Sequence, residues 1–412
     1  MTGIEDTEQG ESPPAHEPSC GTTDEQPAES PPPREEPAAP PIVDVHDLDW
    51  AAVRESASPA EVRQRLPGAV EAMERVLDRA DGSLLFDGDR ADASDRAIVV
   101  RQLDTTRSLW FIGDLHGDLL ALEAALALIR RDGGDAPSLV MLGDLFDDAG
   151  FGLEVLVRVF ELVTAHPESI CVVAGNHDEA LRDDGTRFSS SVSPSDFSDV
   201  LNASLDDEWV RRAGLAAIRL FDHAPRALFL PDGLFVAHGG IPLTDLHDEL
   251  REHGDWNDPR VLQDFVWTRA HARARRKIPN RTSRGSQFGY EDFAAFCALA
   301  TELGRPVHRM VRGHDHEESR YAMPTAYGSN PILTTVAMSR RLAREVFGPD
   351  ARVPTCARWS EGRLPQVYRL HIPEEIVCEM FAADLADDAS VEPDASSNED
   401  LGDASEPAEK QP

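Results

Sequence analysis

The chain has 412 residues, an isoelectric point near 4.6 and a formal net charge of −35 at pH 7. This acidic balance argues against nucleic acid or an anionic membrane as the main partner, because phosphate groups are bound through a basic footprint. No apolar run approaches the roughly 20 residues of a membrane span, and the acidic start MTGIEDTEQGE is unlike a secretory signal.

Both ends of the chain have compositions typical of disordered segments. Residues 1–41 and 383–412 each carry ten acidic residues against one basic residue and few apolar ones. Such segments bury too little apolar surface to offset the entropy lost on ordering. We therefore predict two disordered tails around one catalytic domain, residues 42–382. We interpret the tails as solubilising linkers, with competition for a phosphate site as the alternative.

The cysteines are odd in number and scattered, without CxxC spacing: Cys20, Cys171, Cys297, Cys356 and Cys378. Disulfide frameworks have paired cysteines and oxidising surroundings, so this pattern favours free thiols and a reducing compartment. We expect a cytoplasmic protein.

The predicted elements begin with a helical lead-in, residues 42–97, in which apolar residues between Val70 and Leu77 recur at helical spacing. Strands are predicted over 98–103 and over Leu109–Ile112. The second of these strands opens a β-α-β-α-β pattern, which is typical of the α/β class with a parallel sheet.

Asp118 is placed to cap the first helix of that pattern. The predicted elements after it are a helix over 119–131, a strand over 138–142, a helix over 153–164 and a strand over 169–174. Residues 182–226 then break the rhythm, and we interpret them as a lid-like insertion. Further strands are predicted over 227–230, 234–237, 310–312, 332–337 and 366–370, with a helix over 291–303.

Five clusters of possible metal ligands follow these predicted strands. They are Asp114 with His116, Asp144, Asn176 with His177, His238, and His314 with His316. Strand ends of this kind carry the sites of open α/β sheets. Oxygen and imidazole ligands suit divalent Mn, Fe, Zn or Ni, and one carboxylate that bridges two ions is a common arrangement. We expect two divalent ions, with Mn²⁺ as the ion of choice in vitro.

The motifs that carry these residues resemble the calcineurin-like metallophosphoesterases. GDLHG (113–117), GDLFDDAG (143–150), GNHD (175–178), HGG (238–240) and GHDH (313–316) occur in that family's order. RGSQFGYEDFAAFC (284–297) and Trp267-Thr268 resemble the phosphoprotein phosphatase branch, the Ser/Thr phosphatases, in a bacterial-like form. The resemblance covers roughly residues 98–340. It implies a four-layer αββα sandwich with two central mixed sheets.

The resemblance also implies a role for each residue of the site. The implied ligands of the first ion are Asp114, His116 and Asp144. The implied ligands of the second ion, with Asp144 as the bridge, are Asn176, His238 and His314. His316 matches the last histidine of the wider superfamily, so it is a candidate for the first ion, and a place outside the ligand set is the alternative.

Three residues are implied to act on the substrate. His177 would protonate the leaving oxygen, Asp147 would fix the tautomer of that imidazole, and Arg284 would grip the phosphate oxygens. The implied reaction is in-line attack on phosphorus by a hydroxide that bridges the two ions.

One departure from the family pattern bears on the substrate. Asp148 stands where the branch has a phosphate-gripping arginine, and an acidic side chain there would repel a phosphate dianion unless it points away. The candidates to replace that arginine are Arg312, Arg269, Arg182 and Arg187. In addition, GNHD replaces the commoner GNHE, and residues 330–341 match the branch's late loop poorly.

A phosphoprotein phosphatase is the leading prediction. The alternative substrates are small phosphate esters, such as a dinucleoside polyphosphate or a nucleotide. A phosphate-binding scaffold with weak turnover is the alternative from a different functional class. The presence of every predicted ligand argues against it. The acidic balance disfavours nucleic-acid cleavage.

Overall fold

The structure is a computed structural model that describes residues 40–79, 86–101, 103–104, 108–134, 138–275, 285–342, 345 and 348–382. The predicted disorder of the tails falls outside these ranges for residues 1–39 and 383–412. The tails and the domain boundaries at 42 and 382 therefore stay predictions.

The described ranges contain sixteen strands and twelve α-helices. The strands are β1 (Ile42–Val45), β2 (Ala97–Val99), β3 (Leu109–Ile112), β4 (Ser138–Met141), β5 (Ile170–Val172), β6 (Leu181–Asp183), β7 (Phe188–Ser190), β8 (Ala227–Phe229), β9 (Leu234–Ala237), β10 (Arg269–Ala270), β11 (Gln287–Phe288), β12 (Arg309–Arg312), β13 (Tyr321–Ala322), β14 (Ile332–Thr335), β15 (Thr355–Trp359) and β16 (Gln366–Leu370). The helices are α1 (Trp50–Ser56), α2 (Pro59–Gln64), α3 (Leu66–Leu77), α4 (Leu119–Gly133), α5 (Gly152–Ala165), α6 (Asn176–Ala180), α7 (Asp196–Ala203), α8 (Glu208–His223), α9 (His247–His253), α10 (Pro259–Trp267), α11 (Tyr290–Glu302) and α12 (Glu374–Met380). No helix in these ranges has both the length and the apolar surface that a bilayer crossing requires.

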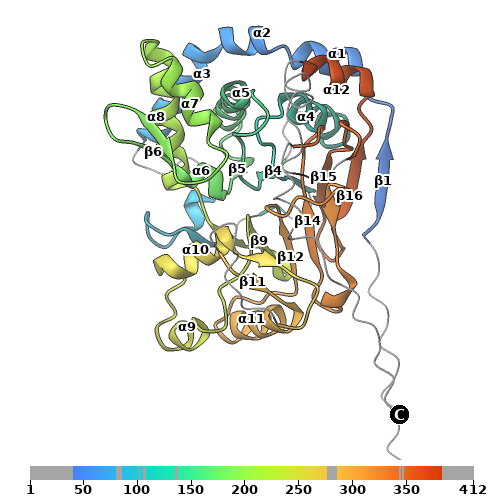
Figure 1. The fold of residues 1–412 in the computed structure, drawn as a ribbon. Coiled ribbons are helices and arrows are strands. Elements are labelled where there is room, and N and C mark those ends of the chain that lie inside the picture. The colour runs from blue at the N-terminus through green and yellow to red at the C-terminus, as the bar shows by residue number, and fades with distance from the viewer. Residues whose placement is uncertain are drawn as a thin grey trace, which may run out of the picture. The chain divides into compact units, whose positions relative to one another are not determined.

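Two mixed six-stranded sheets form the centre of the domain (Figure 1). The strand order is β1-β16-β15-β3-β4-β5 in the first sheet and β13-β14-β12-β9-β8-β2 in the second. Strands β3, β4 and β5 run parallel to one another, as do β9, β12 and β14. Each sheet therefore gathers the carboxyl ends of three neighbouring strands at one edge.

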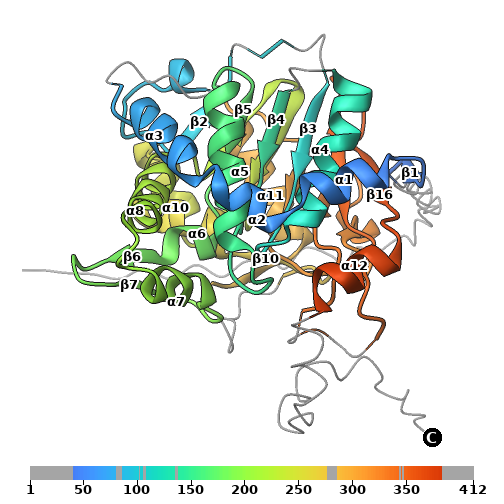
Figure 2. The ribbon, with the colours of Figure 1, turned by 90° about the horizontal axis from the view of Figure 1, so that it is seen from above.

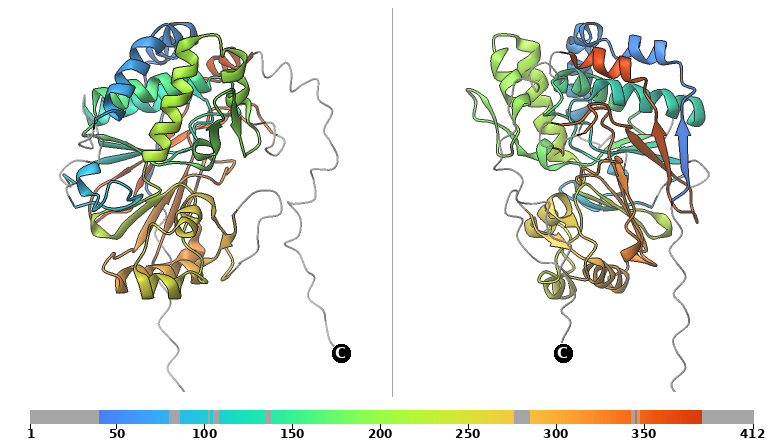
Figure 3. Two further views of the ribbon diagram at one scale, coloured as in Figure 1. Left: turned by 90° about the vertical axis from the view of Figure 1, so that its left-hand side faces the viewer. Right: turned by 45° about the vertical axis from the view of Figure 1, so that its right-hand side comes forward.

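Alternation of side chains along the strands produces the layers. In β3, Leu109 and Phe111 pack into a core between the two sheets, whereas Trp110 and Ile112 pack under the helices on the outer face. Strand β9 alternates in the same way between the inner core and the core under α9, α10 and α11. Helices thus cover the outer face of each sheet (Figure 3), and the predicted α/β fold, a four-layer αββα sandwich, is confirmed.

Helix α4 illustrates how local sequence sets an element that supports the site. The Asp118 side chain accepts a hydrogen bond from the backbone N–H of Ala121 at 2.8 Å, which is an N-terminal cap. Arg130 and Arg131 lie in the last turn, where positive charge is favourable. The helix is apolar on nearly every side because it lies between the first sheet and α1 (Figure 2).

The structure differs from the prediction in the first sheet. Residues Ile42–Val45 form strand β1 beside β16, although the lead-in was predicted to be helical. Strand β15 was not predicted, yet it lies between β16 and β3. Its sequence TCARW carries one charged residue, as does QVYRL of β16, and its place in the sheet comes from pairing with β3 and β16. Predicted and observed bounds agree for β3 and β16, whereas β2 has only three residues.

The segment predicted as a lid-like insertion consists of the β6–β7 hairpin followed by α7 and α8. It contacts the loop after β4, because the rings of Phe146 and Phe197 stack at a centroid distance of 4.2 Å. The backbone N–H of Phe197 also donates to Asp147 at 2.9 Å. This segment therefore supports a predicted site residue directly, whereas a lid motion stays a prediction.

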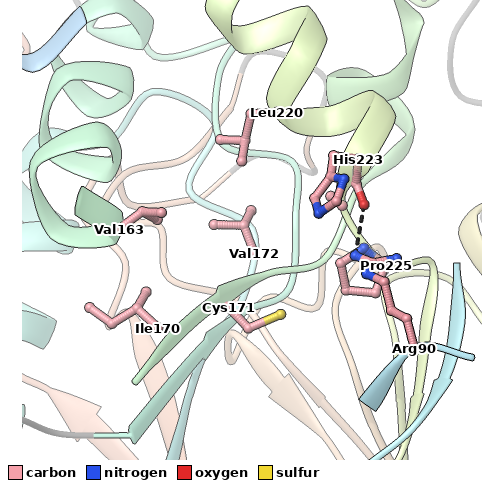
Figure 4. Close-up of a pocket in the computed structure, with 9 residues that line it drawn as sticks. Arg90, Val163, Ile170, Cys171, Val172, Leu220, His223 and Pro225 are labelled. Carbon is pink, nitrogen blue, oxygen red and sulfur yellow. Dashed lines mark hydrogen bonds between the residues drawn. The ribbon is translucent and has the colours of Figure 1, made fainter. Parts of the chain in front are cut away.

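A small cavity of about 20 Å³ lies between β5 and α8 (Figure 4). Its wall is largely apolar, with Arg90 and His223 at one end. This volume holds one water molecule at most, so the cavity is no substrate pocket. Burial raises the pKa of the Cys171 thiol in its wall to about 12, which makes that thiol unreactive. The four described cysteines are all free.

Candidate active site

The predicted ligands meet where the carboxyl ends of strands from both sheets come together. The first sheet contributes Asp114 and His116 after β3, Asp144 after β4, and Asn176 at the start of α6. The second sheet contributes His238 after β9, and His314 and His316 after β12. Six of the seven side chains are buried, and His316 is partly exposed.

Two motif glycines explain how the strand ends approach so closely. A Cβ atom at Gly313 would lie 2.1 Å from Asp114 Oδ1, and one at Gly143 would lie 2.3 Å from the backbone nitrogen of Gly175. Both distances are well inside van der Waals contact, so any side chain there would push the turns apart. Gly143 also has a φ of +93°, a conformation that favours glycine.

Three of the ligands stand in the left-handed region of backbone space. His116, Asp144 and His314 have φ values of +45°, +51° and +71°. Residues with side chains rarely adopt such values, and they concentrate at functional sites because the surrounding structure stabilises the strained turn.

The first group of converging atoms contains Asp114, His116 and His316. His116 Nε2 lies 3.2 Å from His316 Nε2, and His316 Nε2 lies 3.2 Å from Asp114 Oδ2. Two imidazole nitrogens and a carboxylate oxygen thus face one point, which is a donor set that fits a first-row divalent ion. His316, whose place was left open, lies inside the group.

The second group contains Asp144, His238 and His314, with Asn176 beside them. His238 Nε2 lies 3.1 Å from both His314 Nδ1 and Asn176 Oδ1. The other ring nitrogen of His238 donates to the carbonyl of Leu142 at 2.8 Å. That bond fixes the proton on Nδ1 and leaves the Nε2 lone pair for an ion in the neutral ring.

Asp144 lies between the two groups: it is a member of the second, and it also converges with His116 of the first and with His177. Its Oδ2 atom lies 3.6 Å from His116 Nε2 and 3.3 Å from His238 Nε2. Burial opposes the charge of Asp144, but the neighbouring histidines, His238 first, hold its pKa well below the ordinary value. Burial lowers the pKa of His238, yet Asp144 outweighs it and raises that pKa to about 9. The centre of the site therefore attracts positive charge.

His177 and Asp147 form a buried pair next to the groups. Asp147 Oδ2 accepts a hydrogen bond from His177 Nδ1 at 2.7 Å. The backbone N–H of His177 donates to Asp144 Oδ1 at 2.9 Å, so the pair is tied to the shared carboxylate. Burial raises the pKa of Asp147 and its contact with His177 opposes that rise. Such a carboxylate fixes the orientation and tautomer of the imidazole.

Residues 107–318 match the family described as calcineurin-like phosphoesterases, which is about half of the chain and includes all the residues above. The chain belongs to this family. It is a metallophosphoesterase, a member of a family of phosphate-ester hydrolases that use divalent metal ions, and the two groups are candidate metal-binding residues. The predicted family and enzyme class are thereby confirmed.

The phosphoesterase is similar to Ser/Thr phosphatases. It is 24% identical over 234 residues, 54% of this chain and 50% of the relative, to the serine/threonine-protein phosphatase PP2A-like PPG1 of Candida albicans. It is 27% identical over 159 residues, 37% of this chain and 44% of the relative, to the serine/threonine-protein phosphatase 4 catalytic subunit of Saccharomyces cerevisiae. The chain spans about half the length of the curated relatives it matches.

Among solved structures, a protein serine/threonine phosphatase from Saccharomyces cerevisiae with similarity to human phosphatase PP5 aligns with a TM-score of 0.48. The alignment covers 76% of this chain and 89% of that chain at 14% sequence identity. A metallophosphoesterase from Sphaerobacter thermophilus aligns with a TM-score of 0.35 at 15% identity and covers 66% of this chain and 98% of that chain.

The arginines predicted to grip phosphate occupy different places in the phosphoesterase. Arg312 is fully buried and donates to the carbonyl of Gly239 and to Asp315, which argues against a substrate contact. Arg269 also pairs with Asp315, at 2.8 Å, and donates to the carbonyl of His314 at 2.8 Å. Unlike Arg312 it is partly exposed, and it lies beside the second group. Arg182 donates to its own neighbour's carbonyl, and Arg284 lies outside the described residues.

Sequence reasoning missed a carboxylate that ties two ligand-bearing turns of the phosphoesterase. Asp178 accepts backbone N–H groups of Asp144, Leu145 and Gly175 at 2.7, 3.0 and 2.9 Å. Burial and the charge of Asp144 raise the pKa of Asp178 to about 7. The motif GNHD contained the signal, since it places an acidic residue directly after the site residues Asn176 and His177, and the structure shows that this residue is buried.

Proposed function

We propose that this metallophosphoesterase removes phosphate from phosphorylated serine and threonine side chains of proteins with the aid of two divalent ions, Mn²⁺ in vitro. The observation that carries the proposal is the position of Asp144 Oδ2, between His116 Nε2 at 3.6 Å and His238 Nε2 at 3.3 Å. A carboxylate so placed would be shared by an ion in each group.

Bound ions would neutralise the phosphate oxygens and lower the pKa of a bound water from about 15.7 towards about 7. The chain's own residues would then orient the ester. Arg269, beside the second group, and Arg284 would hold phosphate oxygens through planar guanidinium forks. His177, fixed by Asp147 through Nδ1, would present its other ring nitrogen to protonate the leaving oxygen.

The protein substrate and the cytoplasmic location are the finer parts of the proposal. Two relatives are described as serine/threonine-protein phosphatases, which supports protein substrates for this chain. The four described cysteines are free thiols, as a reducing compartment requires.

A small phosphate ester, such as a dinucleoside polyphosphate, is the second candidate substrate. Asp148 favours it, because this residue replaces an arginine with which the phosphatase branch grips the phosphate. Loss of that contact weakens the selection for a phosphomonoester dianion.

A direct comparison of substrates tests the proposal. The full chain, loaded with Mn²⁺, is given a phosphoserine or phosphothreonine peptide and diadenosine tetraphosphate, and kcat/KM is measured for each. We expect kcat/KM for the peptides to be at least tenfold higher than for the dinucleotide. A tenfold difference corresponds to about 1.4 kcal/mol of transition-state binding. A preference for the dinucleotide would overturn the proposed substrate, and no hydrolysis of either would overturn the proposed reaction.

The role of His177 has a separate test. Replacement His177→Gln removes the general acid, whose contribution is typically 10²- to 10⁴-fold. The loss in kcat should be large for a phosphoserine peptide and small for p-nitrophenyl phosphate, because nitrophenolate leaves without a proton. Equal losses with both substrates would contradict proton donation by His177.

A further inference from the structure

The two histidines of the first group each have a second carboxylate behind the ring. His116 Nδ1 lies 3.4 Å from Asp148 Oδ2, and His316 Nδ1 lies 4.0 Å from Glu345 Oε1. The opposite ring nitrogens, both Nε2, face each other at 3.2 Å inside the group. Each imidazole therefore stands between the converging donor atoms on one side and a carboxylate on the other.

The backbone around Asp148 holds its side chain against His116. The N–H of Asp148 donates to Asp196 Oδ1 at 2.8 Å, and Arg340 donates to the Asp148 carbonyl. The residue has a φ of +72°, and its side chain is only 12% exposed. The carboxylate thus points inward to the imidazole of His116.

Glu345 is held from the other side by a buried cation. Arg320 is fully buried and pairs with both carboxylate oxygens of Glu345, at 2.5 and 3.0 Å. The same guanidinium donates to the carbonyls of Arg340 at 2.6 Å and Met338 at 3.3 Å. Arg340 also bonds to the loop of Asp148, so one short segment braces both carboxylates.

We infer that Asp148 and Glu345 are positioning residues for the ion in the first group. A neutral imidazole carries one proton on one of two nitrogens. A carboxylate that accepts from Nδ1 keeps the proton there, leaves the Nε2 lone pair for the ion and makes the ring a stronger ligand. Asp148 Oδ2, at 3.4 Å from His116 Nδ1, is the carboxylate placed for this, whereas Glu345 Oε1, at 4.0 Å from His316 Nδ1 and paired with Arg320, acts on His316 through its charge alone. We therefore expect Asp148 to have the larger effect on metal affinity. This inference rests on the proposed use of metal ions at this site.

Asp148, which stands where the phosphatase branch has an arginine, thereby has a function in this chain. An arginine at this position would place a second cation next to His116 and compete with the ion for the available negative charge. Asp148 supplies charge to the ligand instead of to the substrate. Binding of the phosphate oxygens then falls to arginines on the far side of the site, such as Arg269, which bonds to the carbonyl of His314.

Metal binding to the full chain tests this without reference to turnover. After chelation, Mn²⁺ is titrated by calorimetry, and the electron paramagnetic resonance spectrum shows whether two ions are coupled. For Asp148→Leu we expect the affinity for one ion to fall about 10- to 100-fold, the usual effect of losing such a partner. The other ion should bind as in the wild type and give the six-line spectrum of isolated Mn²⁺.

Two further variants sharpen the result. Asp148→Asn keeps an acceptor oxygen beside Nδ1 and should recover part of the lost affinity, and Glu345→Gln, which keeps an oxygen for Arg320, should cost less than Asp148→Leu. Asp199→Asn is the matched control, because Asp199 is exposed on α7 and its replacement removes one charge without facing an imidazole. The urea unfolding midpoint of each apo-protein shows that the variants are folded.

Three outcomes separate the hypotheses. Wild-type protein that never binds two ions would overturn the proposed function itself. Wild type with two coupled ions and Asp148→Leu with the same affinities and spectrum would overturn this inference alone. Equal weakening at both ions in Asp148→Leu would also overturn it, because a positioning residue for His116 should act on the first group.

Discussion

Adding one carbon atom at Gly313 should disable the site without removing any ligand. A Cβ there would lie 2.1 Å from Asp114 Oδ1 and 3.6 Å from His238 Nδ1. A carbon and an oxygen atom in contact are separated by about 3.2–3.5 Å, so the carboxylate or the turn has to move by about 1 Å. The carboxylate has little room, because both of its oxygens accept the N–H of His314 at 2.9 and 3.0 Å.

The expected cost has two parts. Overpacking of a tight interior typically costs about 1–3 kcal/mol of unfolding free energy. A displacement of about 1 Å at a catalytic centre typically costs about 10²-fold in rate. We therefore expect Gly313→Ala to remain folded, to bind Mn²⁺ less tightly and to hydrolyse phosphate esters about 100-fold more slowly.

The measurements are Mn²⁺ titration, phosphate release and urea unfolding of the same preparation. Gly68→Ala is the control, because Gly68 lies in α3 and a Cβ there would meet nothing within 4 Å. The control should be slightly more stable than the wild type, since alanine favours a helix by about 1 kcal/mol over glycine. Wild-type metal affinity and turnover in Gly313→Ala would refute the account of how the strand ends are held together.

Three further predictions concern stability. Arg312→Met should lower the unfolding free energy by about 1–3 kcal/mol, because it removes the hydrogen bonds of a buried guanidinium to Gly239 and Asp315 while Arg269 still pairs with Asp315, and urea unfolding measures this loss. Phe235→Ala should cost about 3–5 kcal/mol by the same measurement and leave the number of bound Mn²⁺ ions unchanged, because the ring is fully buried under the outer helices. Burial raises the pKa of Glu154, and Arg63 opposes that rise. The folded chain therefore binds the Glu154 proton more tightly than the unfolded chain does. The contribution of Glu154 to stability falls as pH rises above about 4.5. Glu154→Gln should therefore gain stability relative to the wild type between pH 5 and pH 7, and a constant difference in urea midpoint across that range would contradict the assignment.

The sequence was sufficient to predict that the candidate ligands converge, because they follow strands of the two sheets and have motif glycines near them. Asp114, Asp144 and His238 come directly or almost directly after β3, β4 and β9, and the carboxyl ends of parallel strands share an edge. The pattern of apolar residues in the sequence could not show that two sheets stack face to face. That arrangement was expected from the family resemblance, and the inner core that includes Phe111 bears it out.

Residues that act on the ligands from behind could not be predicted. Glu345 reaches His316 only because buried Arg320 holds it, and a contact between such distant elements leaves no periodic pattern in the sequence. The direction of Asp148 depends on its backbone φ of +72° and on Asp196, neither of which a motif encodes. Strand β15 was missed because its place in the sheet comes from pairing with β3 and β16 and not from its own apolar character.

The central claim is that Asp144 is shared by two divalent ions, and a count of bound ions tests it most directly. Chelated full-length protein is loaded with Mn²⁺, separated from free metal and measured by elemental analysis, in the wild type and in Asp144→Asn. The position of Asp144 Oδ2 between His116 and His238 predicts two tightly bound ions in the wild type and loss of at least one in the variant. One ion in the wild type, or two equally tight ions in Asp144→Asn, would contradict the claim.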